Sequence, residues 1–257
     1  MDLSWLEALA LLGVGVVSGA LNVLAGGGSF LSLPLLIFLG LPPTVANGTN
    51  RIAILVQNAG AVWRFRRHGL LDRSWIPLAA APAIAGAALG TWGAIEIGDE
   101  AFRRALAVLM VVVTLWILWD PLARREAGTI RRGGADAASA APRAGLVAAF
   151  FVVGLYGGFV QAGIGFLLAA VAIWAGLDLV RGNALKVLVV LLLTPLSLAL
   201  FAWSGKVDWV VGTPLAAGHL IGALAGVRLT VLKGHAWIKR VLVVAVIAFA
   251  IKLWAAP

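Results

Sequence analysis

Long apolar segments alternate with short polar or glycine-rich connections along almost the whole chain. Most of these segments reach or approach the roughly 20 residues that a helix needs to cross a bilayer core of about 30 Å. They predict membrane helices at residues 3–25, 44–64, 75–95, 101–119, 144–160, 180–203, 209–229 and 237–254. Gly86 and Gly90 lie at the spacing that lets two membrane helices approach closely. The pattern therefore predicts an all-α polytopic membrane protein.

Two of the apolar segments are interrupted by glycine. The run of glycines at 26–28 interrupts the first, and a second group lies within 157–165. Glycine costs about 1 kcal/mol relative to alanine inside a helix, so both groups should end the helices before them. The apolar segments that follow, 30–39 and 166–175, are too short to span a bilayer. We expect two broken or re-entrant helix pairs, because irregular backbone at membrane depth is tolerated where protein or a cavity surrounds it.

The second part of the chain repeats the first at one ungapped offset. Asn183 lies 136 residues after Asn47 (183 − 47 = 136). The same offset pairs Gly27 with Gly163, Phe30 with Phe166, Gly69 with Gly205, Asp72 with Asp208, Gly86 with Gly222 and Gly90 with Gly226. Matches of Asn and Asp are informative in a chain so rich in alanine and leucine. We divide the chain into a first membrane repeat at 1–120, an Arg-rich cytoplasmic linker at 121–143 and a second membrane repeat at 144–257.

Basic residues in the connections indicate how the two repeats are oriented. In the first repeat they gather between Arg64 and Arg73 and in the linker, whereas in the second they follow the segment 209–229. Because Lys and Arg concentrate in cytoplasmic loops, the second repeat should be inverted relative to the first, with both termini extracytoplasmic. Inverted repeats with discontinuous helices near the midplane are the architecture of many secondary transporters.

Composition supports a membrane location and narrows the classes of function. The 257 residues are 62% hydrophobic and 12% charged, with a mean hydropathy of +1.02. The net charge of +9 lies mainly in the connections, so we interpret it as an orientation signal and expect no nucleic-acid partner. The absence of cysteine excludes disulfides and thiolate chemistry. We expect a multi-pass protein of the cell (plasma or inner) membrane that is not an enzyme and needs no cofactor.

Amide and basic side chains recur near the start of the helix that follows each short arm. Asn47, Asn50 and Arg51 lie within about one turn, and the repeat supplies Asn183 and places Lys186 at the position of Asn50. Charges at membrane depth are costly and usually face a cavity or a partner, and this set of donors suits an oxyanion. Alternatively, the amides bridge helices and the cations extend to the interface.

The whole candidate substrate site also includes residues beside the glycine breaks. Asn22 and Gln161 each precede a break, and backbone N–H groups at the restarted helices attract anions. The candidate residues are Asn22, Gly26, Gly27, Gly28, Asn47, Asn50, Arg51, Gln161, Gly163, Asn183 and Lys186. No residue is expected to be catalytic or to bind a metal. Thr44 is the expected N-cap of the helix that carries Asn47.

The chain resembles the sulfite exporter TauE/SafE family, also called the 4-toluene sulfonate uptake permease family. The residues that carry the resemblance are 26–34, 40–50, the basic loop 66–69 and the second-repeat counterparts within 157–186. The resemblance implies transport of small sulfur oxyanions, organosulfonates or related organic anions, coupled to an ion gradient of protons or sodium. The direction of transport and the oligomeric state stay open.

Other classes of function stay open beside this one. An anion channel, or a transporter of other small organic anions, would share the same basic and amide lining. An intramembrane hydrolase would need Ser29 as nucleophile and His219 as base, but Gly165 replaces Ser29 in the repeat. His219 either carries a coupling proton or is structural, and Gln57 and Asn58 are interpreted as packing residues. A divalent-cation transporter is disfavoured because the membrane segments lack carboxylate and histidine clusters.

Overall fold

The structure is a computed structural model that describes residues 3–24, 26–119, 142–177 and 179–233. Over these residues the chain forms nine α-helices and one 3-10 turn, Arg73–Trp75, and no strand. The helices are α1 Trp5–Leu24, α2 Ser29–Phe38, α3 Pro43–Arg67, α4 Ile76–Glu96, α5 Asp99–Trp119, α7 Arg143–Phe159, α8 Ile164–Trp174, α9 Leu179–Trp203 and α10 Trp209–Lys233. The all-α prediction is confirmed for this part of the chain. Residues 121–141 of the predicted linker and the predicted helix at 237–254 lie outside the described residues.

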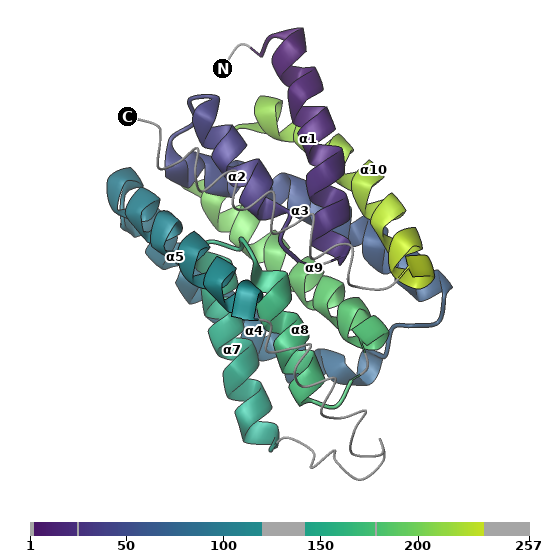
Figure 1. Ribbon diagram of the computed structural model, residues 1–257. Coiled ribbons are helices and arrows are strands. Elements are labelled where there is room, and N and C mark those ends of the chain that lie inside the picture. Colours follow the sequence, from purple (N-terminus) through teal and green to yellow (C-terminus); the bar gives the residue numbers. More distant parts are fainter. Residues whose placement is uncertain (1–2, 25, 120–141, 178, 234–257) are drawn as a thin grey trace.

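Two pairs of long helices pack closely through small residues. Helix α1 lies along α10, and α4 lies along α7 (Figure 1). A Cβ atom added to Gly86 or Gly90 of α4 would collide with backbone atoms of α7, and Gly222 of α10 is equally close to α1. The close helix contact predicted from the spacing of Gly86 and Gly90 is therefore confirmed.

Helices α3 and α9 pack against each other between these two pairs. α3 also contacts α10 and α2, and α9 also contacts α4 and α8. The buried polar side chains of α3 include Asn47, Asn50, Arg51, Gln57 and Asn58, each 2% exposed or less. Because buried polar groups need partners, α3 is held by hydrogen bonds as well as by apolar packing.

Helix α3 begins earlier than predicted and is capped from a distant helix. Its first residue is Pro43, and proline suits this position because an N–H there would have no helical acceptor. Thr44 is therefore not the N-cap, and that prediction was wrong. Instead, the Thr44 N–H and hydroxyl both donate to Asp99 Oδ1, at 2.9 and 2.7 Å. Asp99 begins α5, so this contact joins the first turns of α3 and α5.

Several of the described helices have the length and surface of membrane spans. Four of them are long and apolar enough to cross a membrane: Trp5–Leu24, Ile76–Glu96, Val180–Trp203 and Trp209–Arg228. Large apolar side chains on their outer faces are exposed, among them Leu89, Trp92, Trp203 and Ile221. Exposing such an apolar surface to water would be unfavourable, whereas contact with lipid tails is not. The chain is a multi-pass membrane protein.

The helices on either side of residues 120–141 correspond in their bounds and in their neighbours. Helices α3 and α9 begin 136 residues apart (179 − 43 = 136) and also end 136 residues apart (203 − 67 = 136). α2 packs on α3 as α8 packs on α9, and the contact of α1 with α10 corresponds to that of α7 with α4. The Asp208 N–H, just after α9, donates to Thr49 Oγ1 near the start of α3 at 2.9 Å. The end of α9 therefore lies beside the start of α3, and the two central helices run antiparallel.

Candidate functional site

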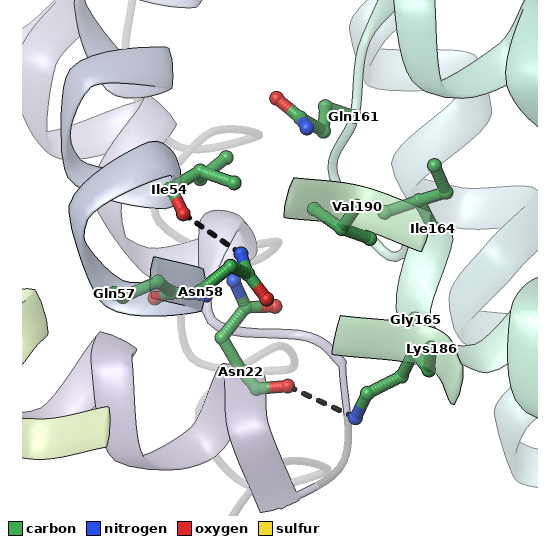
Figure 2. A pocket seen from close by; sticks show the side chains of 9 residues that line it. All are labelled: Asn22, Ile54, Gln57, Asn58, Gln161, Ile164, Gly165, Lys186 and Val190. Atoms are coloured by element: carbon green, nitrogen blue, oxygen red, sulfur yellow. Dashed lines mark hydrogen bonds between the residues drawn. The ribbon is translucent and has the colours of Figure 1, made fainter. Parts of the chain in front are cut away.

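A small pocket lies between α1, α3, α8 and α9, where the two halves of the chain meet (Figure 2). The pocket is partly open to its surroundings, and in this conformation it has room for about one water molecule. Its lining residues are Asn22, Ile54, Gln57, Asn58, Gln161, Ile164, Gly165, Lys186 and Val190. Ile54 of α3 and Val190 of α9 face it from opposite sides and are related by the sequence offset (190 − 54 = 136). The pocket therefore lies where equivalent faces of the two central helices meet.

The break between α7 and α8 borders this pocket at Gln161, and the end of α1 borders it at Asn22. Gly26 at the first break has a φ of 88° and Gly163 at the second a φ of 75°, values that glycine adopts without strain. A Cβ atom on Gly26 would collide with the backbone of Gly165, and one on Gly165 would collide with the backbone of Gly26. The first break and the first turn of α8 therefore cross in backbone contact, which requires glycine at both crossing positions.

Lys186 of α9 reaches from the pocket wall to the end of α1. Its ammonium donates to the carbonyl oxygens of Val23, at 2.8 Å, and Asn22, at 3.3 Å (Figure 2 shows the second bond). The side chain is 4% exposed. This contact places a cation at the negative end of the α1 dipole and satisfies carbonyl groups that the break leaves without helical partners.

Arg51 of α3 holds the end of α7 in the same way. Its Nη2 donates to the carbonyl oxygen of Gly158 at 2.5 Å, and its Nη1 donates to that of Gly157 and to Gln161 Oε1, both at 3.2 Å. The guanidinium carbon also lies 4.8 Å from the ring centroid of Phe201, a cation–π contact. Each broken helix end is thus bound by a buried cation from the other half of the chain.

Gln161 joins the two halves at the second break. It is the one non-glycine residue with a positive φ, 63°, among the residues that the structure describes. A side chain in this backbone region costs about 1–3 kcal/mol. Two hydrogen bonds hold it there, since Oε1 accepts from Arg51 and Nε2 donates to Thr194 Oγ1 at 2.8 Å.

The other predicted amides lie beside the pocket and not on its wall. Asn47 Nδ2 donates to the last carbonyl oxygen of α7 at 2.8 Å. Asn50 accepts a hydrogen bond from Ser32 at 2.7 Å and donates one to Ser29 at 3.3 Å. Asn183 is buried, and its Nδ2 has no hydrogen-bond partner within the described part of the chain.

Of the residues predicted for the site, the structure brings Asn22, Gln161 and Lys186 together on the pocket wall. Gln57 and Asn58 also line it, although from the sequence we interpreted them as packing residues. The sequence held a signal for Asn58, because it lies two helical turns after Arg51 and so continues the same polar face of α3.

His219 of α10 lies behind the pocket wall. Its Nδ1 is 2.7 Å from Gln57 Oε1, and its buried Nε2 has no hydrogen-bond partner among the described residues. The serine that a hydrolase would use, Ser29, accepts a hydrogen bond from Asn50. No hydrogen bond in the described structure joins Ser29 to His219, so the nucleophile–base pair of a hydrolase is not formed.

The chemistry of the pocket is that of a donor-rich site. Its polar side chains are amides and one ammonium, and its lining includes no carboxylate. The first turn of α8 borders the pocket at Ile164 and Gly165, and no side chain caps this helix. A helix N-terminus beside an ammonium attracts anions. No group of three or more His, Cys, Asp or Glu side chains that could hold a metal ion occurs in the described ranges.

A bundle of membrane helices around a buried polar pocket is typical of membrane transporters. The sequence model of the family described as "Sulfite exporter TauE/SafE" matches residues 11–253. The chain therefore belongs to this family and is a membrane transporter of this type.

Curated relatives agree with this assignment. The chain is 28% identical over 245 residues to "Probable membrane transporter protein ORF9" of Sinorhizobium sp, an alignment that covers 94% of this chain and 90% of the relative. It is 27% identical over 234 residues to a "Probable membrane transporter protein" of Haemophilus influenzae, covering 90% and 88%. It is 28% identical over 242 residues to "Probable membrane transporter protein YfcA" of Escherichia coli K12, covering 93% and 87%. No solved structure matches the chain significantly.

Proposed function

We propose that this chain is a secondary transporter that moves small sulfur oxyanions or organosulfonates across the cytoplasmic membrane by alternating access. The pocket between α1, α3, α8 and α9 is its binding site. The observation that carries the proposal is the pocket lining, in which Lys186, two glutamines and two asparagines stand beside the N-terminus of α8 without a carboxylate. Such a lining favours an anion over a cation.

Sulfite and sulfonate groups each present three oxygens that accept hydrogen bonds in different directions. The donors around the pocket are arranged to match, since Asn22 comes from α1, Gln57 and Asn58 from α3, Gln161 from the second break and Lys186 from α9. In this proposal Asn47 and Arg51 hold the end of α7 near the anion and Asn50 holds the first turn of α2, while Asn183 is a buried amide whose Nδ2 has no partner among the described residues. Gly26, Gly27, Gly28 and Gly163 permit the breaks that bring those ends to the pocket.

We further propose that the chain consists of two inverted repeats, residues 1–120 and 144–257, joined by a cytoplasmic linker at 121–143. The coincident bounds of α3 and α9, their antiparallel packing and the matching neighbours of the other helices support this reading. Alternating access then consists of one repeat rocking or sliding against the other around the pocket. The crossing of Gly26 over Gly165 is a contact that would change in such a motion.

The proposed function is tested by flux into liposomes that contain the purified protein. The panel compares sulfite, thiosulfate and benzenesulfonate with acetate and with Mg²⁺. We expect saturable flux of the sulfur anions and strong loss of flux in Lys186→Met. The matched control is Lys206→Met, because the Lys206 ammonium also binds a helix-end carbonyl, that of Ile95 at 2.7 Å, but lies outside the pocket.

Two results would contradict the proposal. Flux confined to carboxylates or to divalent cations would reject the substrate class. Flux that rises without saturation and shows no counterflow exchange would favour the anion channel over the transporter.

A further inference from the structure

Lys186 is the one titratable side chain among the residues that line the pocket. Its ammonium donates to two carbonyl oxygens, of Val23 and Asn22. An ammonium has three N–H donors, so these contacts leave one donor for a ligand. Lys186 can therefore touch a bound anion while it still holds the end of α1.

The helices packed against α9 bring no carboxylate to Lys186. The titratable side chain that α3 carries nearest the pocket is Arg51, and its guanidinium is bound to the end of α7. Helix α7 carries Tyr156, whose hydroxyl donates to the carbonyl oxygen of Ala162. The residues of α8 include no titratable side chain. The cations and the phenol near the pocket thus offer Lys186 no negative charge.

The acidic residues of α1 and α4 lie at helix ends away from the pocket. Glu7 is in the first turn of α1, opposite the end that Lys186 binds, and Glu96 is the last residue of α4. His219 faces the site from α10, but its ring contacts Gln57 and does not line the pocket. Among the described residues, no ion pair compensates the charge of Lys186.

The surroundings of Lys186 couple the protonation of its amine to the binding of an anion in the pocket. A buried ammonium whose partners are only carbonyl groups is costly to keep charged, whereas a neutral amine is not. An anion in the pocket supplies the missing opposite charge and favours the protonated form. By thermodynamic reciprocity, a proton on Lys186 must strengthen anion binding by the same factor.

We propose that Lys186 is the proton-binding residue of the transporter, so that each anion crosses the membrane together with one proton. On the loading side the amine lone pair takes a proton from water, and the resulting ammonium binds the anion. On the other side the anion leaves, the N–H bond breaks, and the proton passes to water. A singly charged sulfonate then moves without net charge. This inference rests on the proposed function and adds the coupling ion and its carrier.

Asn183 provides a donor that can replace Lys186 at the end of α1. Its counterpart in the first half, Asn47, donates to the carbonyl oxygen of Phe159. The offset of 136 relates Phe159 to Val23 (159 − 23 = 136), and Val23 is the residue whose carbonyl oxygen accepts from Lys186. Among the residues that the structure describes, Asn183 Nδ2 has no hydrogen-bond partner. If Lys186 gives its bond to Val23 over to the anion and keeps its bond to Asn22, Asn183 is the donor that the repeat places near Val23.

The test uses benzenesulfonate, which stays a monoanion from pH 5 to pH 9, whereas sulfite itself titrates in this range. Liposomes that contain the protein and an internal pH dye receive benzenesulfonate from outside. We expect the lumen to acidify in step with sulfonate entry. In detergent, the affinity of the parent should fall by about tenfold per pH unit once Lys186 loses its proton, because one proton is linked to binding.

Three variants identify the carrier of the proton. Lys186→Arg keeps a permanent charge, so sulfonate binding should remain and lose its pH dependence, and flux should no longer acidify the lumen. Lys206→Met should retain the pH dependence of the parent. His219→Asn should also retain it. A pH dependence that survives in Lys186→Arg but disappears in His219→Asn would overturn the proposal.

A measurement on the parent needs no variant to fold. Calorimetry of benzenesulfonate binding in two buffers of different ionisation enthalpy counts protons directly, and we expect uptake of about one proton per anion above the pH at which Lys186 deprotonates. Sulfonate flux without proton uptake or acidification overturns this inference and leaves the proposed function standing. Absence of flux for every sulfur anion overturns both.

Discussion

The carbonyl oxygens of Asn22 and Gly158 occupy equivalent positions in the two halves of the chain (158 − 22 = 136), and each accepts a hydrogen bond from a buried cation of the other half. Lys186 binds the first and Arg51 the second. Both carbonyls lie near the end of a helix that a glycine break interrupts. The two cations therefore perform the same structural role, but Lys186 alone also lines the pocket.

Replacing Arg51 with methionine should destabilise the protein. The change removes three hydrogen bonds and leaves the buried carbonyl oxygen of Gly157 without the Arg51 donor, while that of Gly158 keeps the bond from the Thr91 hydroxyl. Because a hydrogen bond to a charged group contributes about 1.5–3 kcal/mol, we expect a loss of at least about 3 kcal/mol. The apparent midpoint of thermal unfolding in detergent should fall by about 6–12 °C. Arg66→Met is the control, since Arg66 is exposed at the end of α3; equal shifts in both variants would contradict the role of Arg51.

Replacing Gly90 with alanine should push α4 away from α7. The added Cβ would collide with the carbonyl oxygen of Leu155, whereas the same change at Gly93, one turn further along α4, meets only the edge of Phe159 at 3.9 Å. Overpacking costs about 1–3 kcal/mol, and alanine favours a helix over glycine by up to about 1 kcal/mol. Thermal unfolding should therefore show a lower midpoint for Gly90→Ala and an equal or higher one for Gly93→Ala. The reverse order would reject this packing.

Much of the fold could be predicted from the sequence because local residues decide where its helices end. The glycines at 26–28 and the basic cluster after Arg64 mark helix ends that the structure places within a few residues of the prediction. The prediction that Thr44 is the N-cap was wrong because Thr44 itself donates to the carboxylate of Asp99, which is distant in sequence.

The candidate site was only partly predictable, because its shape depends on contacts across the two halves. Asn47, Asn50 and Arg51 were predicted to lie within about one helical turn, and α3 does contain all three, but no local pattern shows that Arg51 turns to Gly158 and not to the pocket. Gln161 was chosen for its place before a glycine, while its backbone conformation follows from bonds to Arg51 and Thr194.

The proposed topology predicts that both termini are extracytoplasmic and that Arg66 and Arg132 are cytoplasmic. The charge inversion between the repeats motivates this prediction. The chain has no native cysteine, so single cysteines can be placed at Arg66, at Arg132 and at either terminus and labelled in intact cells with a reagent that cannot cross the membrane. We expect labelling at the termini alone. Termini on opposite faces would reject the inverted repeat.

The last prediction compares two asparagines to locate the substrate site. Asn22 lines the pocket, and its side chain points toward Asn58 there (Figure 2). Asn47 does not line the pocket and binds the carbonyl oxygen of Phe159. Asn22→Ala should weaken benzenesulfonate binding by about tenfold or more, because a hydrogen bond to a charged group contributes about 1.5–3 kcal/mol. Asn47→Ala should lower the unfolding midpoint, since it removes the hydrogen bond to the carbonyl oxygen of Phe159, and should change affinity much less.

Calorimetry on purified variants that elute as the parent does measures the affinities, and thermal unfolding measures the stabilities. If Asn47→Ala weakens binding more than Asn22→Ala does, the anion lies nearer the start of α3 than the pocket. That result would make Asn47 and Arg51 direct ligands, and Lys186 would then act on the anion only through the end of α1.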